Sequence, residues 1–137
     1  MFSGLQNSNL SKAPMDLAVL ILRVCSGAFI MTHGIPKVNK IIAGDLGFGD
    51  PIGLGPELSL ILVAFAETVG ALCIIFGLGT RWATIPLIIA MGVAALVHHA
   101  ADPFGSKEKP LLFMVVFVVL LLTGSGKYSL DRGLLKK

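Results

Sequence analysis

The sequence predicts an all-α integral membrane protein, an antiparallel bundle of four transmembrane helices. Of its 137 residues, 55% are hydrophobic and 14% are charged, whereas soluble domains have about 25% charged residues. The mean hydropathy is +0.86. The charged residues gather in short clusters between long apolar stretches, and each stretch is close to the length at which a helix crosses the ~30 Å hydrocarbon core.

Four apolar stretches define the expected spans, at residues 15–36, 58–78, 82–100 and 109–123. They belong to a membrane domain, residues 15–131, between a polar N-terminal segment (1–14) and a basic tail (132–137). Backbone polar groups in lipid need internal partners, so the spans are helices. The alternative for the fourth span is a buried core helix of a soluble protein. This span is slightly short, so its helix should begin within the preceding loop.

The connections between the spans indicate how the helices are arranged. Residues 77–81 are too few for anything but a tight turn, so the second and third spans form an antiparallel hairpin. The segment 37–57 is rich in glycine and proline, which predicts a long loop that can cover one end of the bundle.

The distribution of basic residues predicts the orientation, because cytoplasmic flanks carry more Lys and Arg. The side with both termini has Lys12, Arg81, Lys127, Arg132, Lys136 and Lys137, and the other side has Lys37, Lys40, Lys107 and Lys109. Both termini are therefore expected in the cytoplasm. The net charge of +3 comes without a basic stripe interleaved with aromatic residues, so no nucleic-acid partner is expected.

Two ionisable residues lie inside the predicted spans, where a charge costs ~2.5–3.5 kcal/mol on insertion scales. Arg23 is expected ~12 Å and Glu67 ~16 Å from the cytoplasmic side at the helical rise. These depths predict a direct bidentate pair between them. The pair could be purely structural and set the helix register, or it could form part of a ligand or proton site.

The first span carries a polar stripe on one helical face, which should point into the bundle. The stripe comprises Asp16, Arg23, Ser26, Ile30, His33 and Lys37, flanked by Gly27 and Gly34. On the second span, the face of Glu67 holds the small residues Ala64, Gly70 and Ala71. Small residues allow either a close helix contact or a cavity.

The three histidines are expected near the outer surface, because His33 ends the first span and His98 and His99 end the third. Adjacent histidines point about 100° apart on a helix, so no metal site is predicted. The histidines are either interfacial hydrogen-bonding groups or proton donors to a ligand such as a quinone. We predict a polar pocket open to the outer leaflet, and the residues assigned to ligand binding or proton relay are Arg23, His33, Lys37, Glu67 and His98.

Several short motifs, in order along residues 15–131, resemble the DoxX family of small four-helix membrane proteins. They are Arg23, His33-Gly34-x-x-Lys37, Glu67-Thr68-Val69-Gly70, Gly77-Leu78-Gly79-Thr80-Arg81, His98 and the segment from Gly124 to Asp131. Ser125 departs from the family pattern, which usually has proline there. By this resemblance the structural motif residues are Gly34, Gly70, Gly79, Arg81, Gly124, Gly126 and Asp131.

The resemblance implies a multi-pass inner (plasma) membrane protein linked to quinones, sulfur compounds or oxidative-stress defence. The first hypothesis is a redox-associated membrane subunit that binds a quinone-type or other small ligand between spans 1, 2 and 3, without a covalent cofactor. If it takes part in catalysis, it does so as a subunit of a quinone-linked oxidoreductase, and no catalytic residue is assigned. The alternative is a non-enzymatic scaffold that holds partner proteins. A small-solute transporter is a third hypothesis, and it would need a homo-oligomer.

The topology can be tested by cysteine labelling in intact cells, in a variant lacking Cys25 and Cys73. A cysteine at Gly47 should react with an impermeant thiol reagent, and one at Lys136 should not. The reverse pattern would overturn the orientation.

Overall fold

A computed structural model gives the structure of residues 12–134. This part of the chain consists of helices and connecting loops and contains no β-strand. Most of the predicted polar N-terminal segment and basic tail therefore lies outside the described residues. The helices are α1 (Lys12–Ile42), α2 (Pro56–Phe65), the π-helical η1 (Ala66–Gly70), α3 (Ala71–Phe76), α4 (Thr80–Val93), the π-helical η2 (Ala94–His98), α5 (Phe104–Thr123) and α6 (Leu130–Leu134).

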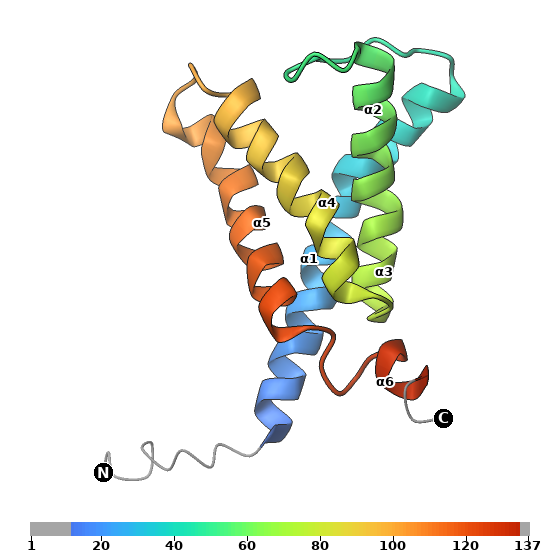
Figure 1. Cartoon of the computed structure of the whole chain (residues 1–137), viewed down its shortest axis with the longest axis vertical. Helices are drawn as coiled ribbons and strands as arrows, with labels where there is room; N and C mark the ends of the chain where they lie inside the picture. The colour runs from blue at the N-terminus through green and yellow to red at the C-terminus, as the bar shows by residue number, and fades with distance from the viewer. Residues whose placement is uncertain (1–11, 135–137) are drawn as a thin grey trace.

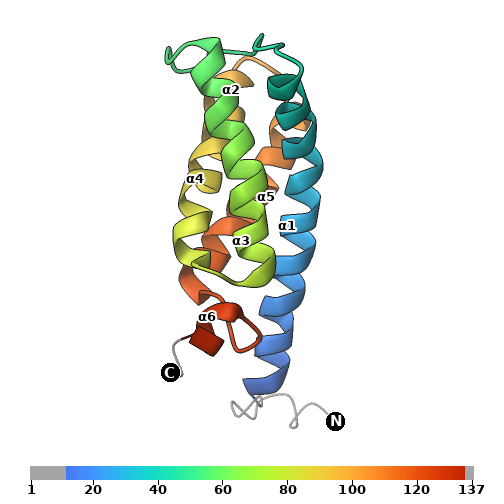
Figure 2. The same cartoon turned by 90° about the vertical axis from the view of Figure 1, so that its right-hand side faces the viewer.

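The helices form two antiparallel pairs. Helix α1 packs beside the continuous rod α2–η1–α3, and α4–η2 packs beside α5 (Figures 1 and 2). In Figure 1 the two pairs diverge towards the end that carries the loops 43–55 and 99–103, which we call the loop end. The opposite, basal end carries the start of α1, the turn 77–79 and residues 124–134.

Among residues 12–134, three helical rods are long and apolar enough to cross a membrane: 12–42, 56–76 and 80–98. Helix α5 begins at Phe104, within the loop that precedes the fourth apolar stretch, as the sequence predicts. Its first turns therefore carry Lys107, Glu108 and Lys109, and its uninterrupted apolar part starts only at Pro110.

Helix α1 is longer than predicted. The expected end at Pro36 is wrong, because the helix continues to Ile42. A proline in a helix removes one backbone donor, but its fixed φ is compatible with helical geometry. The ring of Pro36 is exposed, and the turns on either side keep their hydrogen bonds. Lys37 consequently lies on the helix rather than in the loop.

The second rod, α2–η1–α3, begins and ends with residues that are typical of helix termini. Pro56 occupies its first position, where a missing N–H costs nothing. At the other end Gly77 adopts φ 68°, and the N–H of Leu78 donates to the carbonyl of Cys73 at 2.8 Å. This is a Schellman motif, which needs a residue with positive φ. The chain then turns directly into α4, as the predicted hairpin requires.

Helix α1 approaches the second rod closely through its glycines. A Cβ atom at Gly34 would lie 2.7 Å from the backbone oxygen of Glu67, and one at Gly27 would lie 2.5 Å from the Ile75 side chain. Any larger side chain would push the two helices apart. The face of α1 that carries the predicted stripe is indeed the buried one, since Arg23 and Ile30 are both 1% exposed.

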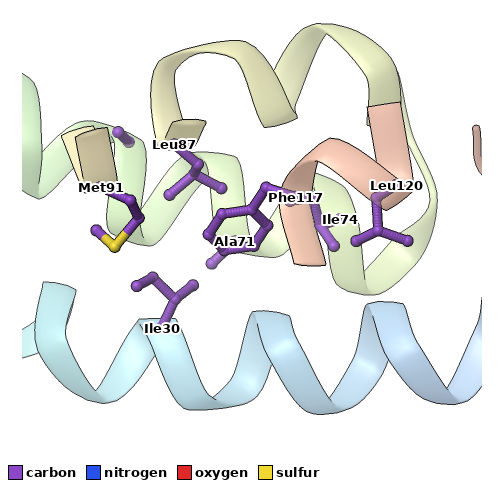
Figure 3. Packing of buried hydrophobic residues seen from close by; sticks show 8 residues of the cluster. Ile30, Ala71, Ile74, Leu87, Met91, Phe117 and Leu120 are labelled. Atoms are coloured by element: carbon purple, nitrogen blue, oxygen red, sulfur yellow. The ribbon is translucent and has the colours of Figure 1, made fainter. Parts of the chain in front are cut away.

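A small hydrophobic core lies between the two pairs (Figure 3). It draws residues from α1, η1, α3, α4 and α5: Ile30, Ala66, Ala71, Ile74, Leu87, Met91, Phe117 and Leu120. Most other large apolar side chains are exposed, as expected for helices whose outer faces meet lipid.

Arg23 is enclosed at the basal half of the bundle and donates to four backbone carbonyls. Its Nε atom donates to Ile74 at 3.0 Å and Nη2 to Ile75 at 3.1 Å. Its Nη1 atom donates to Tyr128 at 2.9 Å and to Ser125. The first two carbonyls belong to the last turn of α3, which carries partial negative charge, and the Ile74 carbonyl also accepts from the N–H of Gly77 at 3.2 Å.

The predicted pair between Arg23 and Glu67 is therefore wrong. Ile74 is seven residues beyond Glu67, or ~10 Å along the helix, and Glu67 binds Lys37 instead. The sequence argument considered only side-chain partners at similar depth. The carbonyls at the end of α3 and after α5 satisfy the guanidinium without a carboxylate.

The basal end is joined by further polar contacts from the predicted motif residues. The carboxylate of Asp131 accepts from the N–H of Gly79 at 2.8 Å, and the N–H of Asp131 donates to the Gly77 carbonyl at 3.0 Å. The carboxylate of Asp16 accepts from the N–H of Lys127 at 3.1 Å. Together with Arg23, these bonds hold the segment after α5 against the first turns of α1 and against the α3–α4 turn.

Replacing Arg23 by Gln should destabilise the protein in detergent by about 3 kcal/mol or more, because four inward-facing carbonyls lose a charged donor. Arg23→Lys should recover only part of this loss, since an ammonium group lacks the planar fork. Thermal unfolding measures the effect, with Lys12→Gln as the control for an exposed charge. Recovery of stability on adding Glu67→Gln would contradict this account.

Candidate functional site

The centre of the candidate site is an ion pair between α1 and η1. The Nζ atom of Lys37 lies 2.6 Å from Oε2 of Glu67, and it also donates to the backbone oxygen of His33 at 3.0 Å. The Glu67 side chain is 4% exposed and that of Lys37 is 20% exposed. Within the described residues, the second carboxylate oxygen of Glu67 receives no hydrogen bond. That oxygen is available to a ligand.

Two π-helical turns shape the site. Glu67 lies on η1 (Ala66–Gly70), and η2 (Ala94–His98) ends the rod of α4. The N–H of His99 donates to the carbonyl of Ala94 at 3.0 Å, five residues back. Such wide turns redirect side chains relative to a regular α-helix and are frequent at functional sites. The sequence pattern predicted uninterrupted α-helices in both places, so the two π turns are a finding of the structure.

A cavity of about 430 Å³, which we call the histidine cavity, opens between the two helix pairs beside Glu67. Its apolar wall includes Ile30, Met91 and Phe113. Its polar residues are His33, Lys37, Glu67, His99, Ser106 and Lys109. The ring of His33 meets that of Phe113 edge to face, with centroids 6.2 Å apart.

A second cavity of about 270 Å³, the loop cavity, lies on the other side of the ion pair. Lys37 and Glu67 line both cavities, so the pair stands between them. The loop cavity also contains His98, and the loop 43–55 contributes Phe48 and Gly49. This matches the expectation that the glycine-rich loop lies over the site.

An apolar groove of about 280 Å³ runs along α1 and α5 next to the histidine cavity. Lys109 and Phe113 line both. The remaining lining residues of the groove are Leu22, Cys25, Ser26, Phe29, Leu112 and Val116. A polar cavity that continues into an apolar groove on the outer surface fits an amphiphilic molecule with a small head group and a long apolar tail.

The charge of the histidine cavity favours ligands with acceptor oxygens. Glu67 is already paired with Lys37, which leaves Lys109, Ser106 and the imidazoles of His33 and His99 as donors. His99 Nδ1 lies 2.6 Å from a carboxylate oxygen of Asp102, an interaction that orients its ring. Within residues 12–134, no three His, Cys, Asp or Glu side chains are placed to hold a metal ion.

The structure brings together three of the predicted site residues and separates two. His33, Lys37 and Glu67 share the histidine cavity, whereas His98 lies across the ion pair in the loop cavity. Arg23 lines neither and is bound to the backbone at the basal half. A single pocket lined by Arg23, His33, Glu67 and His98 is therefore not what forms.

Sequence reasoning missed His99, Ser106 and Lys109 as cavity residues. Ser106 and Lys109 were assigned to a connecting loop or a span border, because a cluster of polar residues before an apolar stretch is typical of such positions. The signal that could have found them is the shortness of the fourth apolar stretch. A helix that starts five residues earlier carries these polar side chains along α5 and towards His33.

Comparison with known proteins identifies the family of the chain. The family model "DoxX" matches residues 18–100, which include α1 from Ala18, the whole second rod and the rod of α4. The chain belongs to the DoxX family. All five residues assigned to ligand binding in the sequence lie within the matched range, and so does the whole Lys37–Glu67 ion pair.

Several DoxX-type relatives are similar over most of their length. The "Putative oxidoreductase CatD" of Bacillus subtilis (strain 168) is 30% identical over 117 residues, 85% of this chain and 86% of that protein. The "Inner membrane protein YqjF" of Escherichia coli (strain K12) is 31% identical over 128 residues, 89% and 95% of the two chains. "Inner membrane protein YphA" of the same organism is 26% identical over 132 residues, 88% and 92%.

No solved structure matches the chain. Family membership and the three apolar rods together make this DoxX-family chain a membrane protein.

The Lys37–Glu67 pair should show strong coupling in a double-mutant cycle. Glu67→Gln and Lys37→Met should each lower stability by about 2–4 kcal/mol, because each leaves one charge unpaired in a buried site. The double variant should lose clearly less than the sum of the two. Thermal or denaturant unfolding in detergent gives the three values.

The chain offers a matched control in the exposed pair Lys40–Asp45, whose atoms are 3.4 Å apart and whose side chains are 40% and 63% exposed. Coupling in this pair should stay below ~1 kcal/mol. Equal coupling in the two cycles would show that burial does not strengthen the Lys37–Glu67 contact.

Proposed function

We propose that this DoxX-family chain is a redox-associated subunit of the inner (plasma) membrane that binds a quinone-type head group in the histidine cavity. The quinone is reduced to the quinol with two electrons from a partner redox protein and two protons taken up at the site. This chain contributes binding, orientation and proton-donating groups, and the partner supplies the electrons.

The observation that carries the proposal is the enclosed carboxylate of Glu67, paired with Lys37 on the wall of a polar cavity. An ionisable group at membrane depth is costly and is typically kept for function. The histidine cavity offers two imidazoles beside this pair. A protonated imidazole can donate a proton to a ligand oxygen.

The groove along α1 and α5 supports an amphiphilic ligand over a soluble one. It joins the histidine cavity at Lys109 and Phe113 and is apolar along most of its length. An isoprenoid tail in this groove would lie at the lipid-facing surface while the head group reaches His33. A quinone has this combination of a tail and two acceptor oxygens.

The proposal includes four membrane crossings with both termini in the cytoplasm. Helix α5 has 20 residues, or ~30 Å at the helical rise. Its first turn carries charged residues, whose long side chains can extend to the head-group region. The basal end then faces the cytoplasm, in agreement with the distribution of Lys and Arg. The names of CatD as a putative oxidoreductase and of YqjF as an inner membrane protein support the redox and inner-membrane parts of the proposal.

Binding can be tested with the short-chain quinone ubiquinone-1 and purified protein in detergent. His33→Gln should weaken binding about tenfold, the loss expected for one hydrogen bond to a buried polar ligand. Ala94 also lines the histidine cavity, so Ala94→Leu should weaken binding further by filling part of the cavity without removing a polar group. Native mass spectrometry of the membrane-extracted protein should also show a co-purifying quinone.

The control variant is Asp45→Asn, which removes a charge from the exposed loop at the same end and should bind ubiquinone-1 normally. Unchanged binding in Ala94→Leu and His33→Gln would exclude the histidine cavity as the site. Absence of any quinone binding would leave the scaffold hypothesis, in which the buried charges only hold the bundle together and partner proteins bind outside it.

A further inference from the structure

The basal end contains a cavity that the quinone proposal does not use. It has a volume of about 500 Å³ and lies between the α3–α4 turn, the end of α5 and the segment that follows. Residues Arg81, Trp82, Thr123 and Arg132 line it together with Gly124 and Asp131. It is therefore at the opposite end of the helices from the histidine cavity.

The charges at this end are unbalanced towards the positive. Among the described residues, the ion pairs Lys37–Glu67 and Lys40–Asp45 are in the loop-end half, and so is the contact between His99 and Asp102. At the basal end, Asp16 and Asp131 accept hydrogen bonds from backbone N–H groups. In the described part of the chain, neither Arg81 nor Arg132 lies within ion-pair distance of a carboxylate.

Arg81 is held in place while most of its donors stay available. Its Nη2 atom donates to the carbonyl of Leu122 at 3.2 Å, and its guanidinium passes over Gly124. A guanidinium has five N–H donors in a planar fork that matches a phosphate group. A second arginine, Arg132, is among the residues that line the same cavity.

Exposed apolar side chains border the charged cavity, and this combination suits a bound lipid molecule. Trp82 is 79% exposed and Leu122 is 72% exposed, so an aromatic and an aliphatic side chain border the charged site. Tryptophan is enriched at the membrane–water interface. The exposed apolar residues Ile85 and Ile89 continue along α4. Acyl chains can lie along them while the phosphate reaches the two arginines.

We propose that this cavity binds the phosphodiester head group of an anionic phospholipid. Arg81 and Arg132 hold the phosphate, and Trp82 packs against the part of an acyl chain next to the head group. The inference rests on the membrane setting of the basal end and not on quinone binding. It gives the chain a specific lipid contact at the face proposed to be cytoplasmic.

The test is a titration of delipidated protein in detergent with dihexanoyl phosphatidylglycerol and with dihexanoyl phosphatidylcholine, followed by thermal unfolding and native mass spectrometry. Phosphatidylglycerol should bind about tenfold more tightly than phosphatidylcholine. Arg81→Gln and Arg132→Gln should each lose about tenfold in affinity for it, the loss expected for one charge-assisted hydrogen bond. Circular dichroism shows whether each variant is folded.

Lys127→Gln is the matched control, because it removes a positive charge at the same end from a residue outside the cavity. It should bind phosphatidylglycerol as tightly as the unmodified chain. An equal loss in Lys127→Gln would overturn the site in favour of a diffuse charge effect. Trp82→Ala should weaken lipid binding without affecting inorganic phosphate, and phosphate binding as tight as that of the lipid would overturn the lipid assignment.

Discussion

The structure depends on one buried guanidinium. Arg23 lies on α1, yet the carbonyls it binds belong to the end of α3 and to the segment after α5. In a hydrocarbon environment those carbonyls have no water to bind, so a charged donor with several N–H groups is an efficient way to satisfy them. The same contacts connect α1 to the end of α3 and to the segment after α5, and this closes the basal end of the bundle.

Closure at the basal end leaves the opposite end free to open. The two helix pairs diverge there (Figure 1), and the histidine and loop cavities lie between them on either side of the Lys37–Glu67 pair. Lys37 neutralises the buried carboxylate of Glu67, so the two cavities can have polar walls without an unpaired ion. The divergence of the pairs and the π turns η1 and η2 together produce a cavity that straight, close-packed helices would have filled.

The two ends therefore have different electrostatic characters. Ion pairs gather in the loop-end half, where they shape the cavities. At the basal end Arg81 and Arg132 are exposed, and the carboxylate of Asp131 is bound to a backbone N–H group. A protein placed across a membrane meets different chemistry on its two faces. This asymmetry suits a site for a membrane-soluble head group at one face and an anchoring contact with anionic lipid at the other.

The helical class, the apolar rods, the hairpin at residues 77–81 and the inward face of α1 could all be predicted from local sequence patterns. These patterns are the length of the apolar stretches, the turn residues and the 3.6-residue period, and a lipid environment narrows the structures that they allow. His33, Lys37 and Glu67 were also predicted as candidate site residues. The pairing of Glu67 with Lys37 and of Arg23 with backbone carbonyls is visible only in the folded structure. Partner choice depends on which groups packing brings within 3 Å, and backbone acceptors leave no trace in side-chain patterns.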